Sequence, residues 1–266
     1  MTRSPLFKNK LVKGLALCAA SSLIFSACGT SPEAPAVVKE AQATPKAQEK
    51  KAAAAEAKLT VKLPAIADGA VIPAEYSFCI EDGKGKATFG PNKSPEIKWE
   101  GAPAGTKSFA LIAVDPKVPS KADDVNKDGK TVPASLPRVS FYHWLLADIP
   151  AAMTQLAVGV EGEKVVPKGK KFGKVAHGVR GVNHYTHWFA SNKDMSGKYG
   201  GYDGPCPPWN DEIVHEYHFE VYALDVPSLN LKEGFMGDDL RKAMEGHILA
   251  QGKSVGLYKL NTAVKY

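Results

Sequence analysis

Three polar residues, Asp115, His143 and His215, each occur in an otherwise apolar, alternating segment of the chain. One carboxylate and two imidazoles are the donor types of a metal site, of acid–base catalysis on phosphoesters, and of a pocket that holds a small anion. Buried polar side chains need partners, so the three could meet in one pocket. Three separate, individually satisfied side chains fit the same pattern, and the pattern alone leaves both interpretations open.

The segments that carry these residues are predicted to be β-strands, in which every second side chain shares a face. This rule places Asp115 with Phe109, Leu111 and Ala113, places His143 with Phe141, Leu145 and Ala147, and places His215 with Tyr217, Phe219, Val221 and Ala223.

Short alternating segments with turn signals between them cover most of the chain after residue 58. The expected strands are 59–66, 71–80, 94–101, 107–115, 139–150 and 216–226, a spacing typical of a β-sandwich. One helix is expected over 238–250, where Leu240, Met244 and Ile248 share a helical face. The predicted fold is therefore mainly β, a two-sheet antiparallel β-sandwich with a C-terminal helix.

Residues 199–208 (YGGYDGPCPP) are expected to form a stiff loop ahead of the strand that carries His215. Its glycines permit positive φ, while its prolines fix φ and lack an N–H group. Few free amides remain, chiefly those of Asp203, Gly204 and Cys206. A strand that starts beside such a loop is a suitable place for a ligand.

Four spaced motifs resemble the phosphatidylethanolamine-binding protein family, and within it the bacterial branch often called Raf kinase inhibitor-like. The motifs are Asp115-Pro116 with Pro119, His143-Trp144, GYDGPCPP and His215-x-Tyr217, and GHILAQGKSVGLYKL near the end also matches. The likeness spans residues 59–262. It implies an antiparallel sandwich with a small pocket for anions such as phosphate head groups or carboxylates. The implied pocket residues are Asp115, Pro116, His143, Gly204, Cys206, Pro207, His215 and Tyr217, together with Tyr258 from the tail.

The chain departs from the family pattern at two positions. Lys117 stands where a second acid is usual, which either widens tolerance for doubly charged anions or only alters a surface loop. Cys206 stands where eukaryotic members carry glycine, so their lipid head-group specificity is not transferred. Kinase inhibition is not transferred either, because it depends on a partner that the sequence does not contain.

Two histidine pairs, His184-x-x-His187 and His215-x-x-His218, have the spacing of a helical metal site. On a strand, however, His215 and His218 face opposite ways, and no further ligand accompanies the other pair. The sequence DVNKDG at 124–129 copies the first half of a calcium loop, but Ser135 occupies the position of the bidentate glutamate. We therefore expect no metal site.

No phosphate-binding loop, dinucleotide fingerprint or serine-hydrolase elbow occurs in the sequence. We expect no cofactor and no catalytic residue, and predict a non-enzymatic binder of a small anion. The alternative is a hydrolase that uses Asp115, His143 and His215, either by acid–base chemistry or through a metal-bound water.

Residues 1–28 resemble a bacterial lipoprotein signal. Four basic residues precede the apolar run LALCAASSLIF, which is too short to span a bilayer, since that takes about 20 residues. Phe25–Cys28 resembles a lipobox, in which Cys28 becomes the lipidated first residue; ordinary cleavage with Cys28 incidental is the alternative. Gly29 follows instead of aspartate, which favours the outer membrane with the domain facing the periplasm.

Residues 29–58 are predicted to be a flexible tether rich in Ala, Pro, Lys and Glu, and 59–266 to be one domain. The formal charge of +6 overstates the charge of the mature chain, because four basic residues lie in the signal. No basic block with interleaved aromatic residues occurs, so nucleic acid is not an expected partner. The expected partners are a small anion and, through the lipid anchor, a membrane; a protein partner at the pocket rim is left open.

Two cysteines, Cys79 and Cys206, remain in the predicted domain. An exported domain lies in an oxidising space, so we predict a disulfide between them. Two buried thiols are the alternative.

Overall fold

The computed structural model describes residues 58–266, so the signal, the lipidation of Cys28 and residues 29–57 of the predicted tether lie outside the described residues. Lys58, the last residue of the predicted tether, forms a β-bridge with Gln251 and so belongs to the domain. The strands are β1 Thr60–Lys62, β2 Ala70–Val71, β3 Cys79–Glu81, β4 Ala87–Phe89, β5 Ile97–Glu100, β6 Ser108–Pro119, β7 Arg138–Pro150, β8 Gln155–Leu156, β9 Gly169–Lys170, β10 Gly173–Val175, β11 Gly178–Arg180, β12 Lys198–Tyr199, β13 His215–Leu224 and β14 Ile248–Tyr258. The helices are the 3-10 turn η1 Ala74–Tyr76, α2 Tyr185–Trp188 and α3 Gly237–Met244.

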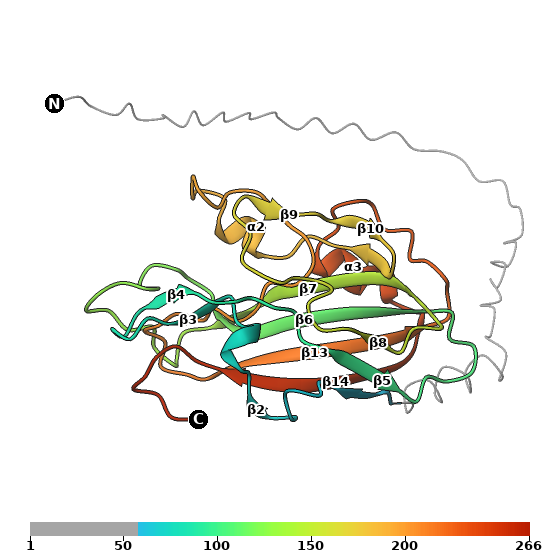
Figure 1. Ribbon diagram of the computed structural model, residues 1–266, viewed down its shortest axis with the longest axis horizontal. Coiled ribbons are helices and arrows are strands. Elements are labelled where there is room, and N and C mark those ends of the chain that lie inside the picture. Colours follow the sequence, from blue (N-terminus) through green and yellow to red (C-terminus); the bar gives the residue numbers. More distant parts are fainter. Residues whose placement is uncertain (1–57) are drawn as a thin grey trace, which may run out of the picture. The chain divides into compact units, whose positions relative to one another are not determined.

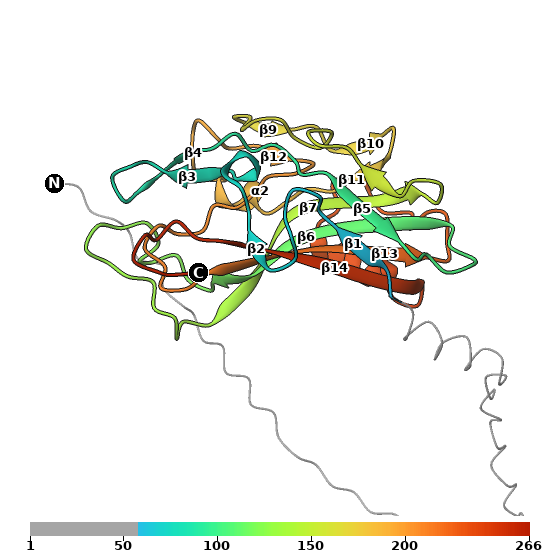
Figure 2. The same ribbon diagram turned by 60° about the horizontal axis from the view of Figure 1, so that its bottom comes forward.

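One seven-stranded sheet forms the body of the domain, in the order β10-β11-β7-β6-β13-β14-β2 (Figure 1). Its neighbours pair antiparallel except β14 with β2, which are parallel. A second sheet, β1-β5-β8, packs across one face of the first (Figure 2). The predicted mainly-β, two-sheet sandwich is confirmed.

Both faces of the central strands are buried. On β6, Phe109, Leu111 and Ala113 face the core shared with the second sheet. The alternate residues Ala110 and Ile112 face a second core, which α3 and the loop before it cover. Strand β6 is therefore apolar on both sides, as expected of a strand between two layers.

The predicted helix and one predicted strand require correction. Helix α3 ends at Met244, and the chain turns at Gly246, whose φ is 81°. Residues 248–250 instead begin β14, because pairing with β13 satisfies their backbone and buries Ala250. The expected strand 71–80 is interrupted after Val71, because Pro73 cannot donate to a ladder and leads into η1.

A β-bulge at His143 alters the predicted phase of β7. Ala113 pairs with Trp144 and Val114 pairs with Tyr142, so His143 has no partner on β6. The extra residue returns Trp144 to the face that carries Phe141, whereas Leu145 and Ala147 turn to the second core. The prediction that His143 shares a face with Leu145 and Ala147 is therefore wrong. The bulge directs the His143 side chain to the end of the sheet, where a pocket lies.

Candidate functional site

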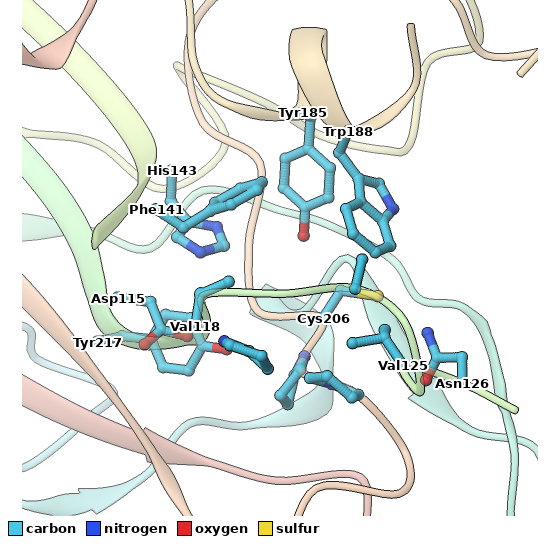
Figure 3. A pocket seen from close by; sticks show the side chains of 14 residues that line it. Asp115, Val118, Val125, Asn126, Phe141, His143, Tyr185, Trp188, Cys206 and Tyr217 are labelled. Atoms are coloured by element: carbon cyan, nitrogen blue, oxygen red, sulfur yellow. The ribbon is translucent and has the colours of Figure 1, made fainter. Parts of the chain in front are cut away.

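A pocket opens where β6, β7 and β13 meet the loop 203–208 and helix α2 (Figure 3). Its cavity volume is about 60 Å³, enough for a small polar group or a few atoms of a ligand but not for an acyl chain. Asp115 and Tyr217 lie side by side at one end, and Trp188 and Val125 lie at the other. The lining residues are Asp115, Val118, Pro119, Ala122, Val125, Asn126, Phe141, His143, Tyr185, Trp188, Cys206, Pro207, Pro208 and Tyr217.

His143 is the polar group best placed to bind a ligand. Its Nδ1 lies 2.7 Å from the carbonyl oxygen of Asp203. Because a carbonyl only accepts, Nδ1 carries the proton, and Nε2 presents a lone pair. No hydrogen bond within residues 58–266 takes Nε2. Burial lowers the pKa of His143 to about 4, with the opposing attraction of Asp115 too weak to prevent it. The imidazole is therefore neutral at pH 7.

His215 has a different environment, between two carboxylates. Its Nδ1 lies 2.7 Å from Asp115 Oδ2, and its Nε2 lies 3.1 Å from Asp211 Oδ2. Burial by itself would lower the pKa of His215, but the hydrogen bonds and attraction from Asp115 and then Asp211 raise it to about 9. His215 is therefore an imidazolium at pH 7, with both nitrogens occupied.

Arg138 completes this row of charges. Its guanidinium makes a bidentate contact with Asp211, at 2.6 and 3.0 Å. Burial would raise the pKa of Asp211, but His215 and Arg138 lower it. The four side chains alternate in sign, from Arg138 through Asp211 and His215 to Asp115. Only the last of them lines the pocket, so His215 offsets a negative charge that would repel an anion.

The buried side chain of Asp203 holds the loop 203–208 in place. Its buried carboxylate accepts from Asn92 and Asn183, both at 2.8 Å, and lies 2.9 Å from Lys170 Nζ. Burial raises the pKa of Asp203, against the opposing effect of Lys170. The same residue accepts the His143 proton through its carbonyl, so the buried network sets the orientation of the imidazole.

The predicted disulfide is present. Cys79 and Cys206 are bonded, with 4.7 Å between their Cα atoms. The Cys79 N–H also donates to the carbonyl of Pro205 at 3.0 Å. The bond ties the pocket side of the loop to β3. Cys206 lines the pocket, and its N–H meets no acceptor within residues 58–266.

The structure brings together five of the predicted ligand-binding residues: Asp115, His143, Cys206, Pro207 and Tyr217. Four others do not line the pocket. Pro116 follows Asp115 along β6 without facing the cavity, the Gly204 N–H donates to Asn92 Oδ1 at 2.8 Å, and the Tyr258 hydroxyl donates to the Cys79 carbonyl at 2.9 Å. His215 is 0 % exposed. Its expected role as a ligand is corrected to that of a buried charge behind Asp115.

Lys117, one of the two departures from the family pattern, lies outside the pocket lining. Its Nζ pairs with Glu216 at 2.5 Å, and its backbone N–H donates to Asp115 Oδ1 at 2.7 Å. Lys117 lies on β6 rather than in a loop, and its ammonium is held by a carboxylate away from the cavity, so the structure favours a change of the surface over a change of the pocket.

Sequence reasoning missed the aromatic wall of the pocket. Tyr185 and Trp188 come from α2, which is too short for a periodic pattern to predict. The Tyr185 hydroxyl donates to the Gly204 carbonyl at 2.8 Å, which holds the ring against the loop. Trp188 is 46 % exposed at the mouth. The one available signal was a cluster of aromatic residues in 185–189, in a segment otherwise rich in glycine and lysine.

The suspected metal motifs have other partners. Asn210 holds the loop 124–130 by accepting from the Asn126 N–H and donating to the Asp124 and Lys130 carbonyls. In the part of the chain that the structure describes, no group of three or more His, Cys, Asp or Glu side chains is arranged to hold a metal.

The fold and the site together define a class: a β-sandwich with a small ligand pocket at the ends of its central strands. Residues 62–259 match the phosphatidylethanolamine-binding protein family. The chain belongs to that family, and its relatives place it in the branch that includes YbcL and YbhB of Escherichia coli.

Two of the relatives align with this chain over almost their whole length. A UPF0098 protein of Methanothermobacter thermautotrophicus is 33% identical over 201 residues, covering 76% of this chain and 99% of the relative. YbhB of E. coli is 27% identical over 191 residues, which cover 72% of this chain and 94% of YbhB. Among solved structures, E. coli YbcL superposes with a TM-score of 0.54 at 26% identity, covering 76% and 99%. The structure of a phosphatidylethanolamine-binding protein homologue from Chlamydia trachomatis superposes with a TM-score of 0.52 at 26% identity. The match covers 77% of this chain and 99% of that one.

Proposed function

We propose that this chain is a non-enzymatic binding protein that holds a small oxyanion, such as a phosphate group or a carboxylate, in the pocket at His143. The observation that supports this most directly is the fixed tautomer of His143, with its Nδ1 proton held by Asp203 and its Nε2 beside the cavity. The unpartnered N–H of Cys206 supplies a second contact of the kind that anions take from backbone amides.

The anion is expected to bind together with a proton. Among residues 58–266, Asp115 is the one charged side chain of the lining, and a neutral imidazole offers an oxyanion only a lone pair. A proton shared between Nε2 and the ligand oxygen removes this repulsion and forms a charge-assisted hydrogen bond, which contributes about 1.5–3 kcal/mol. Binding should therefore take up one proton per anion.

Calorimetry with sulfate tests this, because the charge of sulfate stays constant between pH 5 and 7. Affinity should fall about ten-fold for each pH unit, which is the linkage expected for one proton. His143→Ala should weaken binding at pH 5 by about ten-fold or more and remove the pH dependence.

The matched control is His247→Ala, which removes an imidazole that pairs with Asp225 outside the pocket. This variant should behave as wild type. An affinity that does not change with pH, or that His143→Ala leaves intact, would refute the proposal.

The alternative of a hydrolase has less support from the geometry. A two-histidine, one-carboxylate metal site needs a free nitrogen on each imidazole. Both ring nitrogens of His215 are occupied, Nδ1 by Asp115 and Nε2 by Asp211. Within 58–266 the pocket lining also lacks a serine, threonine or free thiol to act as nucleophile. Elemental analysis of the purified protein separates the two functions, because a stoichiometric metal would favour the hydrolase.

We propose in addition that the protein is an envelope lipoprotein, anchored through Cys28 and held off the outer membrane by the tether 29–58. The basis is the sequence: a basic start, a short apolar run and a lipobox-like Phe25–Cys28. No helix in the described residues is long and apolar enough to cross a membrane.

A further inference from the structure

The segment 164–198 carries an excess of positive charge that the pocket does not use. It contains eight basic residues, Lys164, Lys168, Lys170, Lys171, Lys174, Arg180, Lys193 and Lys198, and one acidic residue, Asp194. Two of the eight are neutralised internally: Lys170 pairs with the buried Asp203 and Arg180 with the buried Glu161. The two buried carboxylates of this region are thus already matched to partners.

The other six lysines, Lys164, Lys168, Lys171, Lys174, Lys193 and Lys198, are exposed, and we call them the lysine face. None of them forms a salt bridge within residues 58–266. Three acidic residues border them, Glu163, Asp194 and Glu233, the last of which lies against Gly173. Positive charge is therefore in excess across this surface.

Backbone pairing brings the central lysines together. Strands β9 and β12 pair in parallel, with Lys198 opposite Gly169. The carbonyl of Lys168 lies against Gly197, and that of Lys171 against Gly200. Lys174 follows on β10, and both views place β9 and β10 along the same side of the domain (Figures 1 and 2). The backbones that carry these exposed lysines are therefore neighbours, which concentrates positive charge on one side of the domain and favours an anionic partner.

Helix α2 connects the lysine face to the pocket. Thr186 of α2 accepts the N–H of Tyr199 on β12, at 3.0 Å. The same helix carries Trp188, half-exposed at the pocket mouth. Tryptophan is the residue that membrane proteins place at the head-group level, and clustered lysines are attracted to anionic lipid surfaces.

We propose that the lysine face, with Trp188 at its border, docks the domain on an anionic phospholipid surface and brings the pocket mouth to the head groups. A lipid surface is a better match for these lysines than a folded acidic protein is. The lysine ammonium is a strongly hydrated point charge, and it lacks the planar bidentate geometry by which arginine recognises individual carboxylates. The inference does not depend on which anion the pocket binds.

Vesicle flotation tests the proposal on the full chain with Cys28→Ser in every protein compared, the one with wild-type lysines included, because an acyl anchor would hold the chain on any vesicle. The vesicles are phosphatidylcholine alone and phosphatidylcholine that also contains phosphatidylglycerol. Residues 1–57 are the same in every variant. Binding to the neutral phosphatidylcholine vesicles therefore measures any contribution of residues 1–57 to membrane binding. Wild type should prefer anionic vesicles, and the preference should vanish at about 0.5 M salt, where screening is nearly complete.

Two triple variants with equal charge change make the test specific. Lys168→Glu with Lys171→Glu and Lys198→Glu should lower partition to anionic vesicles by about 100-fold, at about five-fold or more per lysine. Lys107→Glu with Lys253→Glu and Lys265→Glu changes exposed lysines outside the lysine face and should remain within a few-fold of wild type.

Equal losses in the two triples, or equal wild-type binding to both vesicle types, would overturn the proposal. If the Lys168, Lys171 and Lys198 triple variant melts at a lower temperature than wild type, Lys→Gln at the same three positions repeats the test. Partition to anionic vesicles should then fall by about five-fold for each charge removed. Sulfate calorimetry on the first triple should match wild type, so a failed docking surface and a failed pocket give different results.

Discussion

The row of charges at His215 makes a quantitative prediction about stability and pH. The pKa of His215 rises from 6.5 to about 9 on folding, through its contacts with Asp115 and Asp211. The folded state therefore binds a proton more tightly than the unfolded chain does. This stabilisation is complete below pH 6.5 and is lost as pH rises through 9. At 1.36 kcal/mol per pKa unit it amounts to about 3 kcal/mol, and no discount for solvent screening applies because the side chain is 0 % exposed.

Urea unfolding at pH 6.5 and at pH 9.5, at constant ionic strength, measures the loss. The wild-type free energy of unfolding should fall by about 3 kcal/mol between the two conditions. His215→Gln should be less stable at pH 6.5 by about 3–5 kcal/mol, since it leaves two carboxylates without their shared cation. Its stability should then change little up to pH 9.5.

Two further variants guard against misinterpretation. Asp211→Asn removes one of the two carboxylates, so the alkaline loss should be smaller and should begin at lower pH. Asp225→Asn removes the partner of His247, an exposed pair, and should keep the wild-type dependence. A wild type whose stability is flat from pH 6.5 to 9.5, or a His215→Gln protein with the full alkaline loss, would refute the reasoning.

Two other predictions follow from the covalent chemistry of the chain. Cys79→Ser with Cys206→Ser should lower the free energy of unfolding by about 4–5 kcal/mol, because the bond closes a loop with a sequence separation of 127; equal urea midpoints with and without the bond would contradict this. Cys28→Ser should prevent acylation, so mass spectrometry should find no lipid on the protein, and the mature chain should no longer stay wholly in the detergent fraction. A lipid-bearing Cys28→Ser protein would place the anchor elsewhere.

The sequence by itself determined the central strands, the disulfide and the family of the protein. On 216–226 the period-2 pattern correctly assigned Tyr217, Phe219, Val221 and Ala223 to one core, because an unbroken ladder keeps the phase of a strand. The disulfide followed from the two cysteines of the domain and the expectation that an exported chain lies in an oxidising space. The family and its mainly-β fold followed from motifs whose order along the chain is fixed.

Tertiary structure alone decided which of the two imidazoles faces the cavity. The sequence treats His143 and His215 alike, since each interrupts an apolar strand. A bulge, which no local pattern announces, turns His143 to the cavity. The loop before β13 returns Asp211 to the far side of His215, where it occupies the nitrogen that a ligand would have met. Whether a histidine binds or is buried depends on partners up to 100 residues away, such as Asp115. Folding sets those distances, because side chains from several strands must share one interior.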